Sequence, residues 1–174
     1  MPRSTPARVL CMSTLAAVLV LSAGSVFSAE AKKTVTVPFT ISPTGHAVVK
    51  VIINGHPAIL ILDTGSGACV IHSSQVRKLG LTAKKGKAGL AKGLGTSGKA
   101  VVQIEPFTLT IEGVNFKVTD FLAVDLGNAK EAAGGQELHG MLGATLLIKY
   151  KALIDYDKRT ITLTTAEASA RPAK

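Results

Sequence analysis

The sequence predicts a single all-β domain, and three observations support that prediction. Aromatic residues make up 4% of the 174 residues and tryptophan is absent, so the core must be built from Val, Ile, Leu and Ala. Many of these residues are β-branched, which favours strands. The 17 glycines, with scattered Thr and Pro, indicate frequent turns between short strands. A chain of this length has room for one ordinary domain.

The first 31 residues have the layout of a signal peptide and are set apart from the fold. Arg3 and Arg8 give a basic start, residues 9–20 form an apolar run, and small residues follow. The apolar run is short for a membrane span. We therefore expect a periplasmic or secreted protein that keeps no stable membrane span after signal cleavage.

The signal offers three cleavage positions, after Ser28, Ala29 or Ala31, and an uncleaved anchor is the alternative. The folded domain is expected over residues 32–165, with neither an internal repeat nor a second boundary. The tail, residues 166–174, is expected to be disordered.

Positive charge dominates the chain from Lys32 onward, which carries 18 Lys and Arg against 10 Asp and Glu. Nucleic acid is not an expected partner, because an exported protein meets little of it and no RNA-reading motif of aromatic and basic residues is present. The charge suits an anionic envelope or an acidic substrate. A solvated lysine face explains it equally well.

The N-terminal strands are predicted from alternation and from one strong turn signal. Residues 34–40 alternate apolar and polar, with a proline that pushes this strand toward a sheet edge. Two apolar runs, 46–53 and 57–62, flank Asn54-Gly55. Asn-Gly between apolar runs is a strong β-hairpin signal.

A short strand over 68–72 is expected next, followed by a brief helix over 75–79 that Ser73 or Ser74 caps and Gly80 ends. Residues 82–99 then alternate Lys with Gly. This composition predicts a mobile loop or the tip of a hairpin.

The C-terminal half is expected to hold three strands, a polar loop, a short helix and a closing hairpin. Their ranges are 100–104, 107–111 and 116–124 for the strands, 125–137 for the loop, 144–149 for the helix and 150–163 for the hairpin. Glu112-Gly113 is expected to form the turn between the last two strands.

A carboxylate follows a buried strand at Asp63. Four large apolar residues, 59–62, run directly into Asp63-Thr64-Gly65-Ser66, and such a run suits a strand buried on both faces. A charge close to a core is costly unless it is paired. Function is one explanation, and an ordinary Asx-type turn is the other.

Three elements in this order resemble a single-domain, retropepsin-like aspartic protease. They are the run into Asp63-Thr64-Gly65-Ser66, the apolar-apolar-Gly element Met141-Leu142-Gly143 opening a short helix, and the closing "ALIDYDKRTITL" hairpin. More narrowly, the chain is similar to exported bacterial aspartyl-protease-like domains over about residues 34 to 165. The resemblance implies a closed acid-protease-type β-barrel of one lobe, with one or two short helices.

The resemblance also implies roles for named residues. Asp63 is the expected catalytic residue, with Thr64 locking two loops across a two-fold axis and Gly65 letting the backbone approach the substrate. The Ser66 hydroxyl is placed to bond the carboxylate. Three residues, Met141, Leu142 and Gly143, are expected to pack beneath this loop as structural support.

Carboxylate-based peptide hydrolysis needs two carboxyl groups that share a proton. Asp63 alone has the Thr-Gly turn, so the second group must come from another copy of the chain, and a homodimer is expected. A peptide or protein is the expected substrate, residues 82–99 correspond to the flap of the resembled family, and neither a metal nor an organic cofactor is implied. A catalytically inactive β-barrel that binds peptides or proteins of the cell envelope is the alternative.

Other reactive side chains give weaker patterns. The four histidines lack zinc-ligand spacing, and Ser66 with His72 lacks the Gly-x-Ser-x-Gly elbow of a hydrolase. Cys69, alone after the signal, is expected to be a small core residue. Two positions depart from relatives: His139, where bacterial relatives often have Asp, and Thr145, where retroviral relatives carry Asn or Asp.

Overall fold

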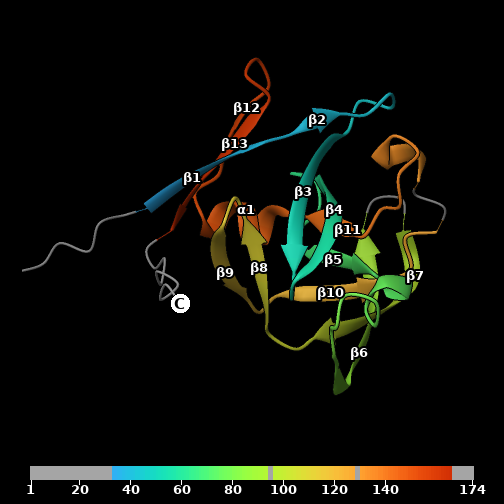
Figure 1. Ribbon diagram of the computed structural model, residues 1–174. Coiled ribbons are helices and arrows are strands. Elements are labelled where there is room, and N and C mark those ends of the chain that lie inside the picture. Colours follow the sequence, from blue (N-terminus) through green and yellow to red (C-terminus); the bar gives the residue numbers. More distant parts are fainter. Residues whose placement is uncertain (1–32, 94–95, 128–129, 166–174) are drawn as a thin grey trace, which may run out of the picture.

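The computed structural model describes residues 33–93, 96–127 and 130–165 (Figure 1). The strands are β1 (Lys33–Pro38), β2 (Thr40–Ile41), β3 (Ala47–Ile53), β4 (His56–Leu62), β5 (Cys69–His72), β6 (Ala83–Gly93), β7 (Thr96–Ile104), β8 (Phe107–Ile111), β9 (Val114–Val118), β10 (Phe121–Val124), β11 (Gly140–Leu142), β12 (Leu153–Asp155) and β13 (Thr160–Thr165). The helical segments are the 3-10 turns η1 (Ser73–Gln75) and η2 (Glu131–Ala133) and the α-helix α1 (Ala144–Lys149). The all-β prediction is confirmed. The predicted signal peptide and the predicted tail, residues 166–174, lie outside the described residues.

The strands form two sheets. The large sheet has the order β6-β7-β10-β5-β11-β4-β3-β8-β9, with β2 added to β3, and it curls around the core. The small sheet has the order β1-β13-β12 and brings the two ends of the domain together. Tyr150, directly after α1, joins the two parts: its ring packs on Phe116 of β9, and its carbonyl accepts the backbone N–H of Thr164 in β13.

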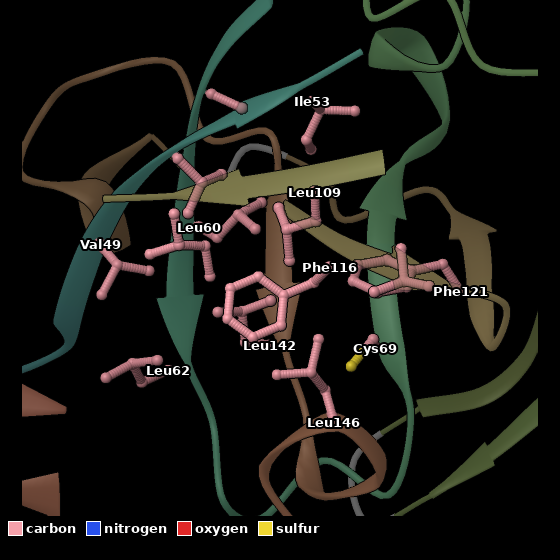
Figure 2. Packing of buried hydrophobic residues seen from close by; sticks show 14 of the residues in the cluster. Val49, Ile53, Leu60, Leu62, Cys69, Leu109, Phe116, Phe121, Leu142 and Leu146 are labelled. Carbon is pink, nitrogen blue, oxygen red and sulfur yellow. The ribbon is translucent and has the colours of Figure 1, made fainter. Parts of the chain in front are cut away.

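The core is mainly aliphatic, as the composition required, and it also contains Phe39, Phe107, Phe116 and Phe121. Side chains alternate along β8 and β9, so one face of each strand is buried. Figure 2 shows Leu60, Leu109, Phe116 and Leu142, from four strands, directed into one interior. Each such side chain contributes roughly 1.5–3 kcal/mol on burial, so this contact network stabilises the sheet on which the Asp63 turn is mounted.

Two predicted turns are confirmed by their backbone. Asn54-Gly55 and Glu112-Gly113 both have two consecutive residues with positive φ, at 47° and 87° and at 46° and 74°. This geometry matches the twist of the flanking strands. The Asn54 side chain also bonds across to Gly80 and to Thr108, which ties the first hairpin to its neighbours.

Two local predictions are wrong. The helix expected over 75–79 is instead the single turn η1 followed by irregular turns, and its cap is His72, whose ring accepts the Ser74 N–H, rather than a serine. The strand expected over 116–124 is interrupted at residues 119–120, where the Thr119 hydroxyl donates to the Asp120 carboxylate and the chain turns from β9 into β10.

Residues 82–99 form most of the β6–β7 hairpin, so the hairpin alternative is the correct one, and its tip at residues 94–95 lies outside the described residues. β6 is an edge strand, and its pairing with β7 is irregular between Ala83 and Ala88. Among the described residues, no helix is long and apolar enough to cross a membrane.

Candidate active site

The Asp63 turn lies where β11 is inserted between β4 and β5. β11 runs parallel to β4, with Leu142 beside Leu62, and antiparallel to β5, with Met141 beside Val70. The Asp63 N–H donates to the Leu142 carbonyl at 3.0 Å, which extends the ladder one residue beyond β4. The backbone of Asp63 is therefore fixed by strand pairing, although the residue itself lies in a turn.

The Asp63 carboxylate is half-buried and is held by its own turn. Its Oδ1 accepts the backbone N–H groups of Gly65 at 2.9 Å and Ser66 at 3.2 Å. A Cβ on Gly65 would lie 3.3 Å from that oxygen, so glycine gives the closest approach here. Within the described residues Oδ2 accepts no hydrogen bond. The Asx turn that the sequence offered as an alternative is present, and it leaves one carboxylate oxygen available.

Gly143 braces the turn from beneath, at the start of α1. The next residue, Ala144, donates its N–H to the Ser66 carbonyl at 2.7 Å. A Cβ on Gly143 would collide with the Ala68 carbonyl oxygen and lie 2.8 Å from that of Ser66, so no larger residue fits. The Ser66 hydroxyl donates to the Ala68 carbonyl at 2.8 Å and does not reach the Asp63 carboxylate.

Cys69 completes this support and is the buried core residue that the sequence predicts. Its sulfur accepts the Gly143 N–H at 3.3 Å and lies 3.5 Å from the Thr145 hydroxyl. Figure 2 shows Cys69 beside Leu142 and Leu146 in the core. Thr145 thus links α1 to β5 through the sulfur.

A second, smaller apolar cluster lies on the other face of β4. Side chains alternate along the strand, so Leu60 and Leu62 enter the main core while Ile61 and Met141 belong to this cluster. The segment 125–138 covers it with Leu126, Ala132, Ala133 and Leu138. Continuing the alternation places Asp63 on this side. The predicted polar loop over 125–137 does not anticipate this contact, which only isolated apolar residues in the segment signal.

Thr64 is exposed and borders a shallow apolar groove of about 320 Å³. The groove is lined by Thr64, Ala144, Leu147, Ile148, Lys151, Ala152 and Ile154. Ile148 is 76% exposed and Leu153, on the edge strand β12, is 68% exposed. The Asp63 turn therefore lies next to uncovered apolar surface.

The weaker patterns form no site within the described residues. No group of three His, Cys, Asp or Glu side chains there could hold a metal ion. Ser66 and His72 have different hydrogen-bond partners. The Ser66 hydroxyl donates to the Ala68 carbonyl, whereas the His72 ring contacts Ser74 and the Gly127 carbonyl.

A model of the aspartyl protease family matches residues 49–146, more than half of the chain. The chain belongs to the aspartyl protease family. The matched range contains β4, the Asp63 turn, Cys69, β11 and the first turn of α1, which are the parts of the site described above. No curated protein matches the sequence.

Two solved structures share the fold. A retropepsin-like aspartic protease from Rickettsia conorii is 20% identical with a TM-score of 0.51, and the alignment covers 77% of this chain and 93% of that chain. The retroviral protease-like domain of Ddi1 from Leishmania major is 16% identical with a TM-score of 0.50, covering 74% and 89%. The predicted acid-protease-type, retropepsin-like fold is confirmed.

Proposed function

We propose that the protein is an aspartic endopeptidase whose catalytic dyad consists of Asp63 from each of two chains. The observation that carries this proposal is the Asp63 turn. A half-buried carboxylate with one free oxygen is fixed by β4, β5 and β11 in a chain of the aspartyl protease family. No cofactor is part of the proposed chemistry.

A second chain is needed because the other carboxylates near strand ends have partners elsewhere. Asp120 accepts the Thr119 hydroxyl, Asp125 accepts the Gly127 N–H, and Asp155 pairs with Lys158 at 2.9 Å. Asp125 bonds the Gly127 N–H as Asp63 bonds the Gly65 N–H, but of these four carboxylates only Asp63 has its backbone N–H paired with β11 and is followed by Thr-Gly. A two-fold axis beside Thr64 would bring the two Asp63 turns together.

The groove beside Thr64 supports this axis. Exposed Ile148 and Leu153 lie on α1 and β12, and β12 is an unpaired edge of the small sheet. A second copy seated there would cover the apolar side chains and pair the edge, and both changes are favourable. The proposed dimer therefore buries the surface that the catalytic turn borders.

In the proposed reaction the two carboxyl groups hold one proton between them, because two adjacent carboxylates cannot both be ionised. The ionised group takes a proton from a water molecule, which attacks the peptide carbonyl carbon. The protonated group hydrogen-bonds the carbonyl oxygen and then supplies the proton that the leaving amine requires. The substrate is an extended peptide, and the β6–β7 hairpin is its proposed lid.

We place this reaction outside the cytoplasm, in the periplasm or beyond, on the strength of the signal-like residues 1–31. Peptide cleavage by the purified protein from acidic to neutral pH, beside Asp63→Asn, tests the function. Asp120→Asn is the matched control, because it removes an exposed carboxylate with a local partner. Activity in the wild type and the control, but not in Asp63→Asn, is expected, and equal cleavage by all three proteins would contradict the proposal.

The dimer has a separate test in Ile148→Glu, which puts charge in the groove, and in Leu153→Lys, which puts charge on the exposed edge strand β12. We expect light scattering to show a dimer for the wild type and a monomer for the variants, with cleavage lost in parallel. A wild-type monomer at micromolar concentration without cleavage would favour the alternative, a peptide-binding or protein-binding module.

A further inference from the structure

His139 joins three strands at the end of β11 that lies away from Gly143. Its backbone N–H donates to the Ile59 carbonyl at 2.9 Å, and its carbonyl accepts the His72 N–H at 2.8 Å. Its ring Nδ1 accepts the Ile59 N–H at 3.1 Å. His139 therefore pairs with both the N–H and the carbonyl of Ile59 in β4 and with the N–H of His72 in β5.

The ring bond exists only while His139 is neutral. An imidazole nitrogen accepts a hydrogen bond when it carries no proton, and both ring nitrogens are donors in the imidazolium. Protonation would place an N–H against the Ile59 N–H, and a backbone donor left unsatisfied in a part-buried position destabilises its strand. The hydrogen bond from the Ile59 N–H is thus sensitive to pH, whereas a bond to a backbone carbonyl would not be.

Charged groups around His139 shift its pKa in opposite directions. Glu137, on its own segment, favours the proton, whereas Lys78, from the turn after η1, opposes it and is itself paired with Glu137 at 2.9 Å. The remaining titratable neighbours on the packed strands are His72 on β5 and Lys50, the cross-strand partner of Ile59 on β3. Burial is the largest effect and lowers the pKa of His139, so the neutral ring is favoured in the fold.

Ile59 and Asp63 belong to one continuous stretch of β4 and its turn. β11 pairs with that stretch from His139–Ile59 to Leu142–Asp63. Loss of the ring bond leaves the His139 N–H to Ile59 carbonyl bond in place, so it weakens one end of the pairing that fixes the Asp63 backbone at the other end. The consequence reaches the catalytic turn without any contact between His139 and Asp63.

We propose that His139 is a positioning residue: as a neutral acceptor it holds β4, and with it the Asp63 turn, and its protonation loosens both. The link to catalysis rests on the proposed function. The protein then has an acid limit set by His139, separate from the titration of the Asp63 pair.

Two variants at the same position separate acceptor from charge. His139→Asn keeps an acceptor oxygen where the ring Nδ1 stands but does not titrate, whereas His139→Leu removes the acceptor at every pH. His56→Asn is the control, because His56 is an exposed histidine of β4 whose ring makes no hydrogen bond to the residues that the structure describes. Amide exchange protection of Ile59 and Asp63 is measured by NMR at about pH 7.5 and about pH 5.5, on either side of the ordinary histidine pKa.

We expect wild type and His56→Asn to lose up to roughly tenfold of this protection at the lower pH, the limit for one histidine titrating one pH unit below its ordinary pKa. His139→Asn should keep it at both values. Equal losses in wild type and His139→Asn, or no loss in wild type, would overturn the proposal even if His139→Leu does not fold.

Cleavage supplies the second readout. The acid limb of kcat/KM should fall roughly tenfold per pH unit in the wild type and move to lower pH in His139→Asn. If no variant cleaves any peptide, the proposed function fails, while the exchange data still decide the role of His139.

Discussion

The two ends of β11 are held by different kinds of contact. At Gly143 the strand ends in backbone hydrogen bonds and contacts so close that a Cβ has no room. At His139 it is held by a titratable ring and lies near the exposed Lys78–Glu137 pair. The Gly143 end, beside the Asp63 turn, is therefore fixed by close packing and backbone hydrogen bonds, while the opposite end depends on a titratable ring. Substitutions at each end should separate these two modes.

The largest effect is expected from Gly143→Ala. The new Cβ would collide with the Ala68 carbonyl, which is backbone and cannot move aside without displacing the Asp63 turn. We expect a loss of about 4 kcal/mol or more in the free energy of unfolding, measured with urea.

Gly67→Ala is the matched control, since a Cβ there meets nothing within 4 Å. A surface change of this kind should stay within about 0.5 kcal/mol. Similar losses in the two variants would mean that close packing at Gly143 does not set the loop.

A smaller effect is expected at Cys69. Cys69→Ala leaves the buried Gly143 N–H without its sulfur acceptor, so stability should fall by about 1–3 kcal/mol. Cys69→Ser supplies an oxygen in place of the sulfur and should recover part of the loss. Equal stability of Cys69→Ala and wild type would show that the sulfur contact adds nothing to packing.

The smallest effect is expected at the opposite end of β11, in the Glu137 carboxylate. Hydrogen bonds from Lys78 and Gln75 lower the pKa of Glu137. A lowered pKa means that its contribution to stability is present above the ordinary value for glutamate, about 4.3, and is lost as the pH falls through the folded value. Both partners of the ion pair are exposed, so the contribution is small and weakens with salt.

Glu137→Gln should remove this acid-limb loss of melting temperature and, because the Glu137 carboxylate favours the proton on His139, should move the separate His139 transition to lower pH without abolishing it. Lys78→Gln removes the other partner of the ion pair. It should therefore also reduce the loss of melting temperature at acid pH. A single acid transition that both variants abolish entirely would contradict the separation between Glu137 and His139.

The sequence was informative where the determinants are local. The Asn54-Gly55 and Glu112-Gly113 hairpins follow from residues that accept positive φ, and the Asp63 turn follows from small residues after an apolar run. The helix over 144–149 was found for the same reason, since a glycine precedes a short apolar segment.

Features that depend on distant partners were not predicted. The insertion of β11 between β4 and β5 needs three residues to pair with two remote strands, and nothing in a short segment specifies that pairing. The cover formed by 125–138 depends on a few apolar residues in a polar segment. The cap of η1 depends on the position of the His72 ring, which the sequence alone does not define.

The most direct test of the shared dyad is to add Asp63→Asn protein to a fixed amount of wild type and follow peptide cleavage after the chains exchange. Random pairing with an equal amount of variant leaves about half of the wild-type chains in wild-type dimers. If each site needs one Asp63 from each of the two chains, activity should fall to about half at equal amounts of the two proteins. It should decline further as more variant is added. Activity that stays constant at every ratio would contradict the account, because each chain would then carry a complete site of its own.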